Sequence, residues 1–445
     1  MRSAAAGAIA SALSRSKVIG ANDRLKVGLI GCGSRGRYVS KLMRQVRNVE
    51  FAAVCDVYDE NAVSARDWAG PGARSYKDFR KLLEQKDVDA VLIATPDHWH
   101  AIPTVLACQA GKDVYVEKPL AHNIREGRAI VEAARRYNRV VQTGTQQRSA
   151  PHYQEVARII RSGELGEVRY VRIWNFSNRY PLGMGRQTDS ATPAGLDWDF
   201  YLGPAPWVPF NQNRFLSSYR WFWDYAGGTI TDFGTHRFDT VHQIMGVEAP
   251  LRIAASGDRY ALNDGSEMPD VLQVTYDYPG FTLSYEACSL NGHGLGGSTP
   301  GMSYYNAQDK EDRPNGEAFY GTNGALFSDR IGFEIYPELK PVSPQDPDAV
   351  PKHSPSGYRM ERRQVAAKDA TALHVENFIE CVNSRQRPAG DVETGHRSTI
   401  VAHFGNIAYK TRQKLIWECG GEDFKDASAA SALLGRQARK PWDLL

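Results

Sequence analysis

Short apolar segments alternate with amphipathic ones through the first third of the chain, and the first apolar segment runs directly into a glycine loop. Leu25–Ile30 reads as a buried strand, and the loop 31–36, with the sequence GCGSRG, follows at once. Further strands are expected at 51–55, 90–94, 113–116 and 140–143, and helices at 38–46, from 78 onward, at 102–110 and at 124–137. This alternation predicts an α/β fold with a parallel, doubly wound sheet.

The pattern changes after Gly144, so we place a domain boundary near Thr145. A helix is predicted at 153–162, and alternation in period two at 168–174, 271–276 and 281–285 indicates half-buried antiparallel strands. Long regions rich in glycine, proline and aromatic residues, roughly 175–222 and 289–318, are expected to shape a binding face. The predicted organisation is a dinucleotide-binding domain at 24–145, a second domain at 146–428 and a surface tail at 429–445.

The segment 1–23 differs in composition from the rest of the chain. One arginine precedes an alanine-rich, weakly apolar run at 4–13, and polar residues separate that run from the first strand. This pattern predicts an export signal and hence a periplasmic or otherwise exported protein. The weak hydrophobicity is typical of twin-arginine signals, and a start site assigned too far downstream would account for the missing arginine pair. The alternative is a disordered tail on a cytoplasmic protein.

The bulk composition sets further limits. A chain of 445 residues is too long for one hydrophobic core and comfortable for two domains. A net charge of +3 gives no reason to expect nucleic acid or an anionic membrane as a partner. No run of about eighteen apolar residues predicts a membrane span. None of the six cysteines forms a C-x-x-C pair, and no metal site is expected.

The glycine loop suits the binding of a dinucleotide pyrophosphate. Gly31 permits a tight turn, Gly33 lets the backbone approach phosphate, and Gly36 allows close packing of helix on strand. The N-terminus of the helix that follows would offer free backbone amides to the phosphates, and Ser34 and Arg35 are further candidate cofactor contacts.

Asp56, at the end of the second predicted strand, follows Gly36 by twenty residues. A carboxylate there can accept hydrogen bonds from both ribose hydroxyls and would repel a 2′-phosphate, which favours NAD over NADP. Arg35 complicates this choice, because a nearby arginine could accommodate the phosphate. The alternative to a cofactor site is a structural turn with a chance aspartate.

A second segment lies past the end of the strand predicted at 90–94, where ligands bind in an open parallel sheet. Its candidate cofactor contacts are Thr95, Pro96, His98 and His100. The two histidines lack a third ligand at a spacing typical of metal sites, and helix capping with local packing is the alternative to a binding role.

The triplet Glu117-Lys118-Pro119 occupies the same kind of position, directly after the strand predicted at 113–116. Glu117 and Lys118 are therefore candidate cofactor contacts. The lysine ammonium would point at the cofactor crevice, and this position predicts a chemical role for Lys118.

A third cluster lies on the helix expected from about Thr229 to Met245. At about 100° per residue, Asp232 and His236 fall on one polar face and neighbour each other. A carboxylate beside an imidazole would orient the ring and raise its pKa, as a general base requires. The alternative is a polar face exposed to solvent.

With these clusters in place, the chain resembles the Gfo/Idh/MocA family of oxidoreductases from Leu25 to about Glu418. The matching motifs are the glycine loop, the Glu117-Lys118-Pro119 triplet, and a run from Gly227-Gly228 through Asp232, Gly234 and His236 to Asp239. The stretches 395–398 and 405–409 also resemble members that carry export signals.

The resemblance implies an N-terminal Rossmann domain and a C-terminal α+β domain with a large, mostly antiparallel sheet. It assigns catalysis to Lys118, Asp232 and His236. His236 would take the hydroxyl proton while hydride leaves the same carbon for nicotinamide, Lys118 would hold the substrate oxygen, and Asp232 would orient the pair. It also implies a cis bond before Pro119, and homodimers or homotetramers that pair through the open face of the C-terminal sheet.

The aromatic loops suggest a carbohydrate or polyol substrate, because sugars stack on aromatic rings and hydrogen-bond to charged groups. Besides Asp232 and His236, the candidate substrate contacts are Arg148, Trp174, Arg179, Trp221 and Tyr225. Core or loop packing is the alternative for half of the aromatic residues.

Three functions remain open. The preferred one is an exported NAD(H)-dependent oxidoreductase that acts on a sugar, cyclitol or related polyol. The second is a glycoside hydrolase that oxidises a sugar transiently, eliminates its substituent and reduces the product with the same bound NAD; an exported protein has no soluble NAD pool, which favours a retained cofactor. The third is a non-catalytic sugar-binding protein, against which intact Lys118, Asp232 and His236 argue.

Overall fold

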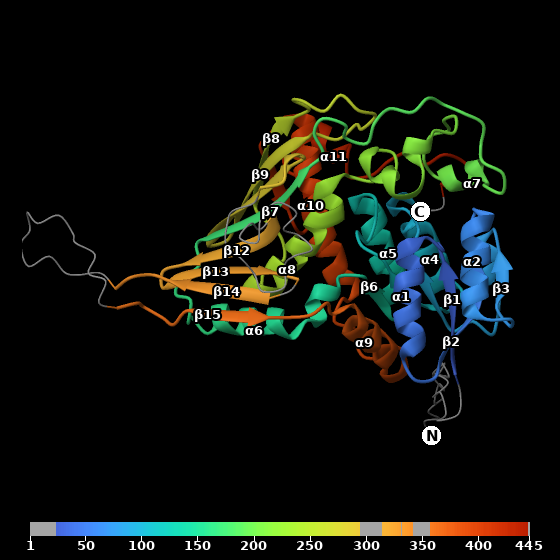
Figure 1. Cartoon of the computed structure of the whole chain (residues 1–445), viewed down its shortest axis with the longest axis horizontal. Coiled ribbons are helices and arrows are strands. Elements are labelled where there is room, and N and C mark those ends of the chain that lie inside the picture. Colours follow the sequence, from blue (N-terminus) through green and yellow to red (C-terminus); the bar gives the residue numbers. More distant parts are fainter. Residues whose placement is uncertain (1–23, 294–313, 331, 341–356, 444–445) are drawn as a thin grey trace, which may run out of the picture.

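A computed structural model describes residues 24–293, 314–330, 332–340 and 357–443 of the chain. The first domain, blue to teal in Figure 1, is a parallel sheet in the order β3-β2-β1-β4-β5-β6. Its strands are β1 (Leu25–Ile30), β2 (Val49–Cys55), β3 (Arg74–Tyr76), β4 (Ala90–Ile93), β5 (Asp113–Val116) and β6 (Val141–Thr143). Its helices are α1 (Ser34–Gln45), α2 (Asp59–Ala69), α3 (Phe79–Leu83), α4 (Ala101–Gln109) and α5 (Ile124–Arg136). The strand order reverses between β1 and β4, which is where ligands bind in such folds.

The predicted doubly wound sheet is confirmed, with differences in its elements. α1 begins at Ser34 rather than near Tyr38, because the glycine loop leads straight into the helix. α2 and β3 were not predicted. The fully buried side chains of α2 are only alanines, Ala62 and Ala65, so the helix has little apolar periodicity, and β3 is a three-residue edge strand.

The second domain is built on a large sheet in the order β15-β14-β13-β12-β7-β10-β9-β8-β16-β17, with β11 also paired to β7. Every neighbouring pair is antiparallel except β7 with β10, so the expected mostly antiparallel sheet is confirmed. Its strands are β7 (Tyr170–Asn178), β8 (Arg252–Asp258), β9 (Val271–Tyr278), β10 (Phe281–Cys288), β11 (Leu290–Asn291), β12 (Asn315–Gly321), β13 (Gly324–Asp329), β14 (Gly332–Pro337), β15 (Arg363–Ala366), β16 (Leu415–Glu418) and β17 (Asp423–Phe424). The helices are α6 (Pro151–Arg161), α7 (Trp198–Leu202), α8 (Thr235–Met245), α9 (Thr371–Ser384), α10 (Val392–Thr411) and α11 (Ser428–Ser431).

Helices α6, α8 and α10 cover one face of this sheet. Buried side chains of all three, including Tyr153, Phe238 and Phe404, form one core with sheet residues such as Leu283 and Tyr276. Because α8 is packed against both the sheet and α10, its N-terminal end is fixed in front of the Rossmann strand ends. That placement brings two distant parts of the sequence to one site.

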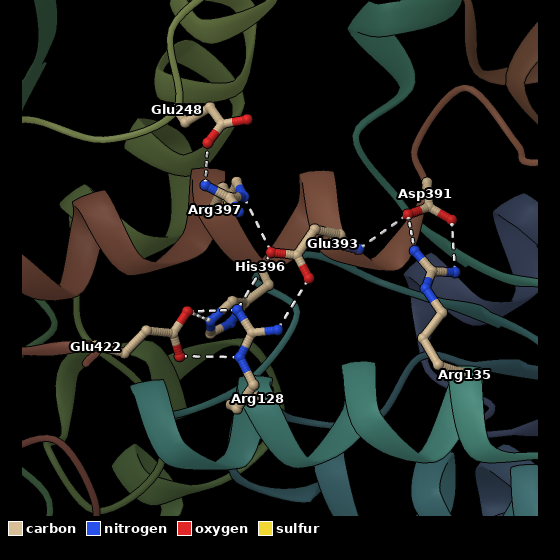
Figure 2. A network of polar contacts seen from close by, with 8 residues as sticks. All are labelled: Arg128, Arg135, Glu248, Asp391, Glu393, His396, Arg397 and Glu422. Atoms are coloured by element: carbon tan, nitrogen blue, oxygen red, sulfur yellow. Dashed lines mark hydrogen bonds and ion pairs between the residues drawn. The ribbon is translucent and has the colours of Figure 1, made fainter. Parts of the chain in front are cut away.

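Ion pairs join α10 to α5 of the Rossmann domain (Figure 2). Arg128 on α5 pairs with Glu393 at 2.9 Å and with Glu422, and Arg135 pairs with Asp391. Arg397 of α10 pairs with Glu393 at 2.9 Å and with Glu248, and His396 contacts Glu422, the same carboxylate that pairs with Arg128, at 3.2 Å. Exposed single pairs contribute little, whereas a shared, partly buried network fixes geometry. The network therefore holds the two domains in register.

The expectation of a surface tail at 429–445 is wrong for its described part. Trp442 is 6% exposed and lies against the rings of Trp99 and Phe200, with centroids 4.8 and 5.0 Å away. Arg436 pairs with Glu126 of α5 at 2.7 Å. The chain end therefore returns to the Rossmann domain and completes its core, which no local pattern indicates. The predicted signal at 1–23 and most of the region 289–318 lie outside the described residues.

The described residues also bear on the presence of membrane-spanning helices, metal sites and disulfides. Within 24–293, 314–330, 332–340 and 357–443, no helix combines the length and apolar content that crossing a membrane requires. In the same ranges no three carboxylate, imidazole or thiol side chains converge to hold a metal ion. All six cysteines are free thiols; four are buried, Cys288 is half-buried and Cys419 is exposed.

Candidate active site

A cavity of about 630 Å³ opens where the C-terminal ends of the Rossmann strands face the start of α8. Most of the predicted site residues line it, namely Gly31, Gly33, Ser34, Arg35, Asp56, Thr95, Pro96, His100, Glu117, Lys118, Asp232 and His236. The cavity therefore joins the glycine loop, the lysine triplet and the α8 motif into one site, although about 200 residues separate the first from the last.

The glycine loop has the shape that a pyrophosphate requires. Gly31 has a φ of +88°, and a Cβ added there would lie 2.6 Å from the carbonyl carbon of Ala94. A Cβ on Gly36 would lie 2.1 Å from the carbonyl oxygen of Gly31. Glycine is therefore required at position 36 by close packing, not by a contact with the cofactor. Gly33 has open space around its Cβ position, and no side chain caps the N-terminus of α1. The start of α1 thus has no side chain bonded to its amides, which suits the binding of phosphate.

Asp56 closes the other end of the cavity. Its carboxylate accepts hydrogen bonds from the backbone N–H groups of Cys32, at 2.7 Å, and Tyr58, at 2.9 Å. Burial raises the pKa of Asp56 to about 6 despite these bonds and the nearby charge of Arg37. The carboxylate is therefore ionised at neutral pH and fixed at the end of β2, where a ribose hydroxyl can reach it.

Arg35 turns away from Asp56. Its Nε donates to Glu117 Oε1 at 2.7 Å, and Glu117 is itself almost fully buried. A second nitrogen of Arg35 lies 3.5 Å from Gln146 Oε1. The guanidinium is therefore tied to the end of β5, and Glu117 supports the loop by holding this arginine.

Lys118 and Asp232 form the central pair of the site. Lys118 Nζ donates to Asp232 Oδ1 at 2.5 Å and to the backbone oxygen of Asp232 at 2.8 Å. Arg220 Nε lies 3.2 Å from the same carboxylate oxygen. Burial alone would raise the pKa of Asp232, but the charges of Lys118 and Arg220 hold it below its ordinary value. The peptide bond between Lys118 and Pro119 is cis, as expected.

His236 is buried at the cavity wall, 3% exposed. The expectation that Asp232 raises the pKa of this imidazole is wrong: burial, together with the charges of Arg330 and Lys118, holds it well below its ordinary value. Asp232 lies within a turn of π-helix at Ile230–Gly234 and His236 in the first turn of α8, and within the described residues no hydrogen bond joins the two side chains. His236 is therefore neutral at physiological pH and can accept a proton.

The two predicted histidines past β4 differ in position. His100 lines the cavity, and its ring nitrogens contact the carbonyl oxygens of Pro119, at 2.6 Å, and Thr95, at 2.9 Å. It ties the two strand-end loops together. His98, in contrast, lies outside the cavity, because its Nε2 is engaged with the carbonyl oxygen of Tyr201 at 3.0 Å in a buried aromatic cluster.

Five predicted substrate contacts also lie outside the cavity lining. Arg148 pairs with buried Asp239 at 2.7 Å and thereby supports α8. Trp174 and Tyr225 are completely buried, since each packs into a core rather than a binding face. The remaining two pack on each other, with the guanidinium of Arg179 centred 3.8 Å from the ring of Trp221.

Several lining residues were not predicted. They include Gln146, Leu216, Tyr219, Arg220, Phe233 and Arg330. Arg220 lies in a short 3₁₀ helix at Leu216–Trp221, and Arg330 lies in the turn between β13 and β14. Neither segment carries a motif, so only the tertiary fold brings these residues to the site.

Comparison with known proteins supports the same division of the chain. The profile described as "Oxidoreductase family, NAD-binding Rossmann fold" matches residues 25–145. The profile described as "Oxidoreductase family, C-terminal alpha/beta domain" matches residues 151–279 and 358–444. The chain belongs to the Gfo/Idh/MocA oxidoreductase family. Its second profile extends through the C-terminal segment that packs on the Rossmann domain.

Individual members of the Gfo/Idh/MocA family are similar over different spans. Inositol 2-dehydrogenase of Salmonella typhimurium is 36% identical over 145 residues, which is 32% of this chain and 43% of that protein. The match thus spans less than half the length of this curated relative. Rhizopine catabolism protein MocA of Rhizobium meliloti is 28% identical over 57% of this chain and 68% of its own length.

A solved structure shares the whole architecture. Levoglucosan dehydrogenase, in complex with NADH and levoglucosan, superimposes with a TM-score of 0.63 at 17% identity, over 88% of this chain and 99% of that one. At this identity the likeness concerns the fold alone. The superposition includes both domains of this chain.

Proposed function

We propose that the protein is an NAD(H)-dependent oxidoreductase that moves a hydride between nicotinamide and a hydroxyl-bearing carbon of a sugar, cyclitol or related polyol. The observation that carries the proposal is the ammonium of Lys118, held by Asp232 in the same cavity as neutral His236 and the glycine loop. The names of the inositol and levoglucosan dehydrogenases support the substrate class.

Each of the three residues has a distinct part in this chemistry. His236, neutral and buried, accepts the proton of the substrate hydroxyl. Lys118 donates to the same oxygen and stabilises the negative charge that develops there. Asp232 holds Lys118 in place by two contacts, at 2.5 and 2.8 Å, so the ammonium needs no reorganisation during the reaction. The nicotinamide, when bound, accepts or returns the hydride.

NAD rather than NADP is the cofactor that the cavity favours. Asp56 presents a half-buried carboxylate at the ribose end, and such a group repels a 2′-phosphate. Arg35, the residue that could have accommodated this phosphate, is bound to Glu117 instead.

A second candidate is a glycoside hydrolase that retains and recycles NAD. It is favoured by the segment that covers the ribose end of the cavity. Asp197 N donates to the carbonyl oxygen of Val57 at 2.9 Å, and the ring of Phe215 lies 5.5 Å from that of Tyr58. Phe215 also lines the cavity. A dinucleotide beneath this cover would dissociate slowly, and a slowly dissociating cofactor suits an oxidation, elimination and reduction cycle.

Assembly into homodimers or homotetramers is a further part of the proposal. The sheet face opposite α6, α8 and α10 carries Tyr170, which is 39% exposed and stacked on Tyr320 with ring centroids 5.3 Å apart. Such a face is suited to pairing with a second copy. Light scattering on the wild type and on Tyr170→Glu tests this: a monomeric wild type contradicts it.

Export is proposed from the sequence of the segment 1–23 alone. An exported protein has no soluble NAD pool, which agrees with the retained-NAD candidate. Fractionation of cells that express the protein from its native locus tests the proposal, and protein found only in the cytoplasm contradicts it.

The function is tested on the purified chain in two steps. NAD that co-purifies is first released by denaturation and quantified. Free sugars, inositols and glycosides are then offered separately, with formation of NADH and release of aglycone as readouts. NADH formed from a free polyol supports the oxidoreductase, and aglycone released without net NADH supports the hydrolase. Saturable sugar binding without either product would leave only a sugar-binding protein.

A further inference from the structure

The cavity has an uneven distribution of charge. Six cationic side chains line it against three anionic ones: Arg35, Arg37, Lys77, Lys118, Arg220 and Arg330 against Asp56, Glu117 and Asp232. In the half of the cavity around His236, Glu117 forms an ion pair with Arg35, and the carboxylate of Asp232 pairs with both Lys118 and Arg220. The excess of cations is therefore greatest where the substrate would lie.

Arg330 is the unpaired member of this set. It lies in the turn between β13 and β14, is half-buried, and lines the same cavity as His236. Among the described residues it has neither a hydrogen-bond partner nor an ion-pair partner, and its charge acts on His236. Asp97 is buried outside the cavity lining, and its carboxylate accepts a hydrogen bond from the Tyr219 hydroxyl at 2.9 Å.

The turn that carries Arg330 is anchored by buried polar contacts. The hydroxyl of Ser328 donates to Glu317 at 2.7 Å, and His152 Nε2 contacts the carbonyl oxygen of Asp329 at 2.8 Å. Glu317 also pairs with Arg237 at 2.7 Å, and all of these side chains are buried. Burying such a network is costly, so it is expected where a position must be exact.

This network also connects Arg330 to the base. Arg237 directly follows His236 in α8, and its guanidinium is held by Glu317 and Asn315 of β12. The same buried glutamate therefore fixes the helix that carries His236 and the hairpin that carries Arg330. Arg330 is a cation without a partner, held near the candidate base His236. Such a cation is suited to pair with an anionic group of the substrate.

We propose that Arg330 binds an anionic oxygen group of the substrate, so that the preferred substrates are sugars or polyols that carry a carboxylate or a phosphate. An arginine fork can donate two parallel hydrogen bonds to either group, whereas a neutral polyol would leave the charge uncompensated. The turnover of such substrates rests on the proposed function, whereas the binding of their anionic group to Arg330 does not.

The test compares Arg330→Gln and Arg330→Lys with the wild type, all loaded with NAD. Glucuronate and galacturonate are offered beside glucose and galactose, and glucose 6-phosphate is offered beside both. We expect the wild type to prefer one anionic class in kcat/KM, and Arg330→Gln to lose about 10- to 100-fold on that class alone. Arg330→Lys should recover part of the loss. The preferred class decides between carboxylate and phosphate.

Two controls separate Arg330 from general effects. Arg136→Gln removes one exposed arginine outside this cavity and should behave as the wild type. The affinity of each variant for NADH is measured by fluorescence titration and should not change at Arg330. A loss of NADH affinity in Arg330→Gln, with discrimination among sugars unchanged, would assign the residue to the cofactor and overturn the proposal.

Binding is measured separately from turnover by calorimetry of the NAD-loaded protein. Anion binding that requires Arg330 without any turnover supports the inference while the proposed function fails. Turnover of neutral polyols that is equal in wild type and Arg330→Gln, with no preference for anionic sugars, overturns the inference while the proposed function stands. An absence of both binding and turnover overturns both.

Discussion

Lys118 Nζ contacts Asp232 twice, at 2.5 Å through the carboxylate and at 2.8 Å through the backbone carbonyl oxygen. The two residues come from different domains, one from the turn after β5 and the other from the π-helical turn before α8. A double contact fixes both the distance and the direction of the ammonium. The relative position of the two domains is thereby coupled to the position of the Lys118 ammonium, which would hold the substrate oxygen.

Replacement of Lys118 by methionine should abolish most of the activity and leave NAD binding intact. The ammonium is the donor that stabilises charge on the substrate oxygen, and the loss of one such donor costs about 10²- to 10³-fold in kcat. Lys81→Met, at an exposed lysine paired with Glu84 on α3, is the control. Undiminished turnover in Lys118→Met would remove the lysine from the mechanism.

The pH dependence should reflect a base that stays neutral in mild acid. Because burial and nearby cations hold the pKa of His236 well below its ordinary value, lowering the pH through about 6.5 should not protonate it. At saturating NAD, the acid limb of kcat/KM for polyol oxidation is therefore expected below that pH. His236→Asn should lower kcat by about 10²- to 10⁴-fold. An acid limb centred near the ordinary imidazole pKa would contradict this.

Cofactor affinity should depend on pH through Asp56. Its pKa is raised to about 6, and ribose hydroxyls bond more strongly to the ionised form, so NAD should bind most tightly above this pH and more weakly below it. Well below pH 6 the affinity should level off at that of the protonated form. Asp56→Asn should bind NAD weakly with no such pH dependence, and should discriminate less against NADP. Fluorescence titration with NADH and NADPH across the pH range measures both effects.

The cofactor half of the site can be predicted from the sequence because each residue there lies at the end of a strand. Asp56 and Lys118 directly follow apolar runs, and the glycine loop lies between a strand and a helix. The substrate half is different. Arg220 and Arg330 come from segments without a motif, and they reach the cavity only because the large sheet and its buried polar network place those segments there.

Aromatic residues mislead a sequence-based prediction for a related physical reason. Trp174 and Tyr225 have the polar and apolar character that suits a sugar site, but large aromatic side chains of this kind also pack in cores, where both of these lie. Burial decides between the two, and burial depends on the tertiary fold. The C-terminal segment is a further example, since its apolar residues are too sparse to predict a core element.

Trp442 should contribute substantially to the stability of the Rossmann domain. It is 6% exposed, stacks on Phe200 at 5.0 Å and meets Trp99 edge-on at 4.8 Å. Truncation of such a side chain to alanine leaves a cavity and typically costs about 3–5 kcal/mol. Leu433→Ala, at a neighbouring side chain that is 37% exposed, is the matched control and should cost far less.

Thermal and denaturant unfolding of Trp442→Ala and Leu433→Ala measure this difference, and saturating NAD provides a second readout. Trp99 and Phe200 both line the cofactor cavity, so the loss of Trp442 should also loosen the wall against which NAD lies. We therefore expect Trp442→Ala to unfold at lower denaturant and to bind NAD more weakly than Leu433→Ala. Equal stability of the two variants would mean that the chain end lies on the surface without supporting the core.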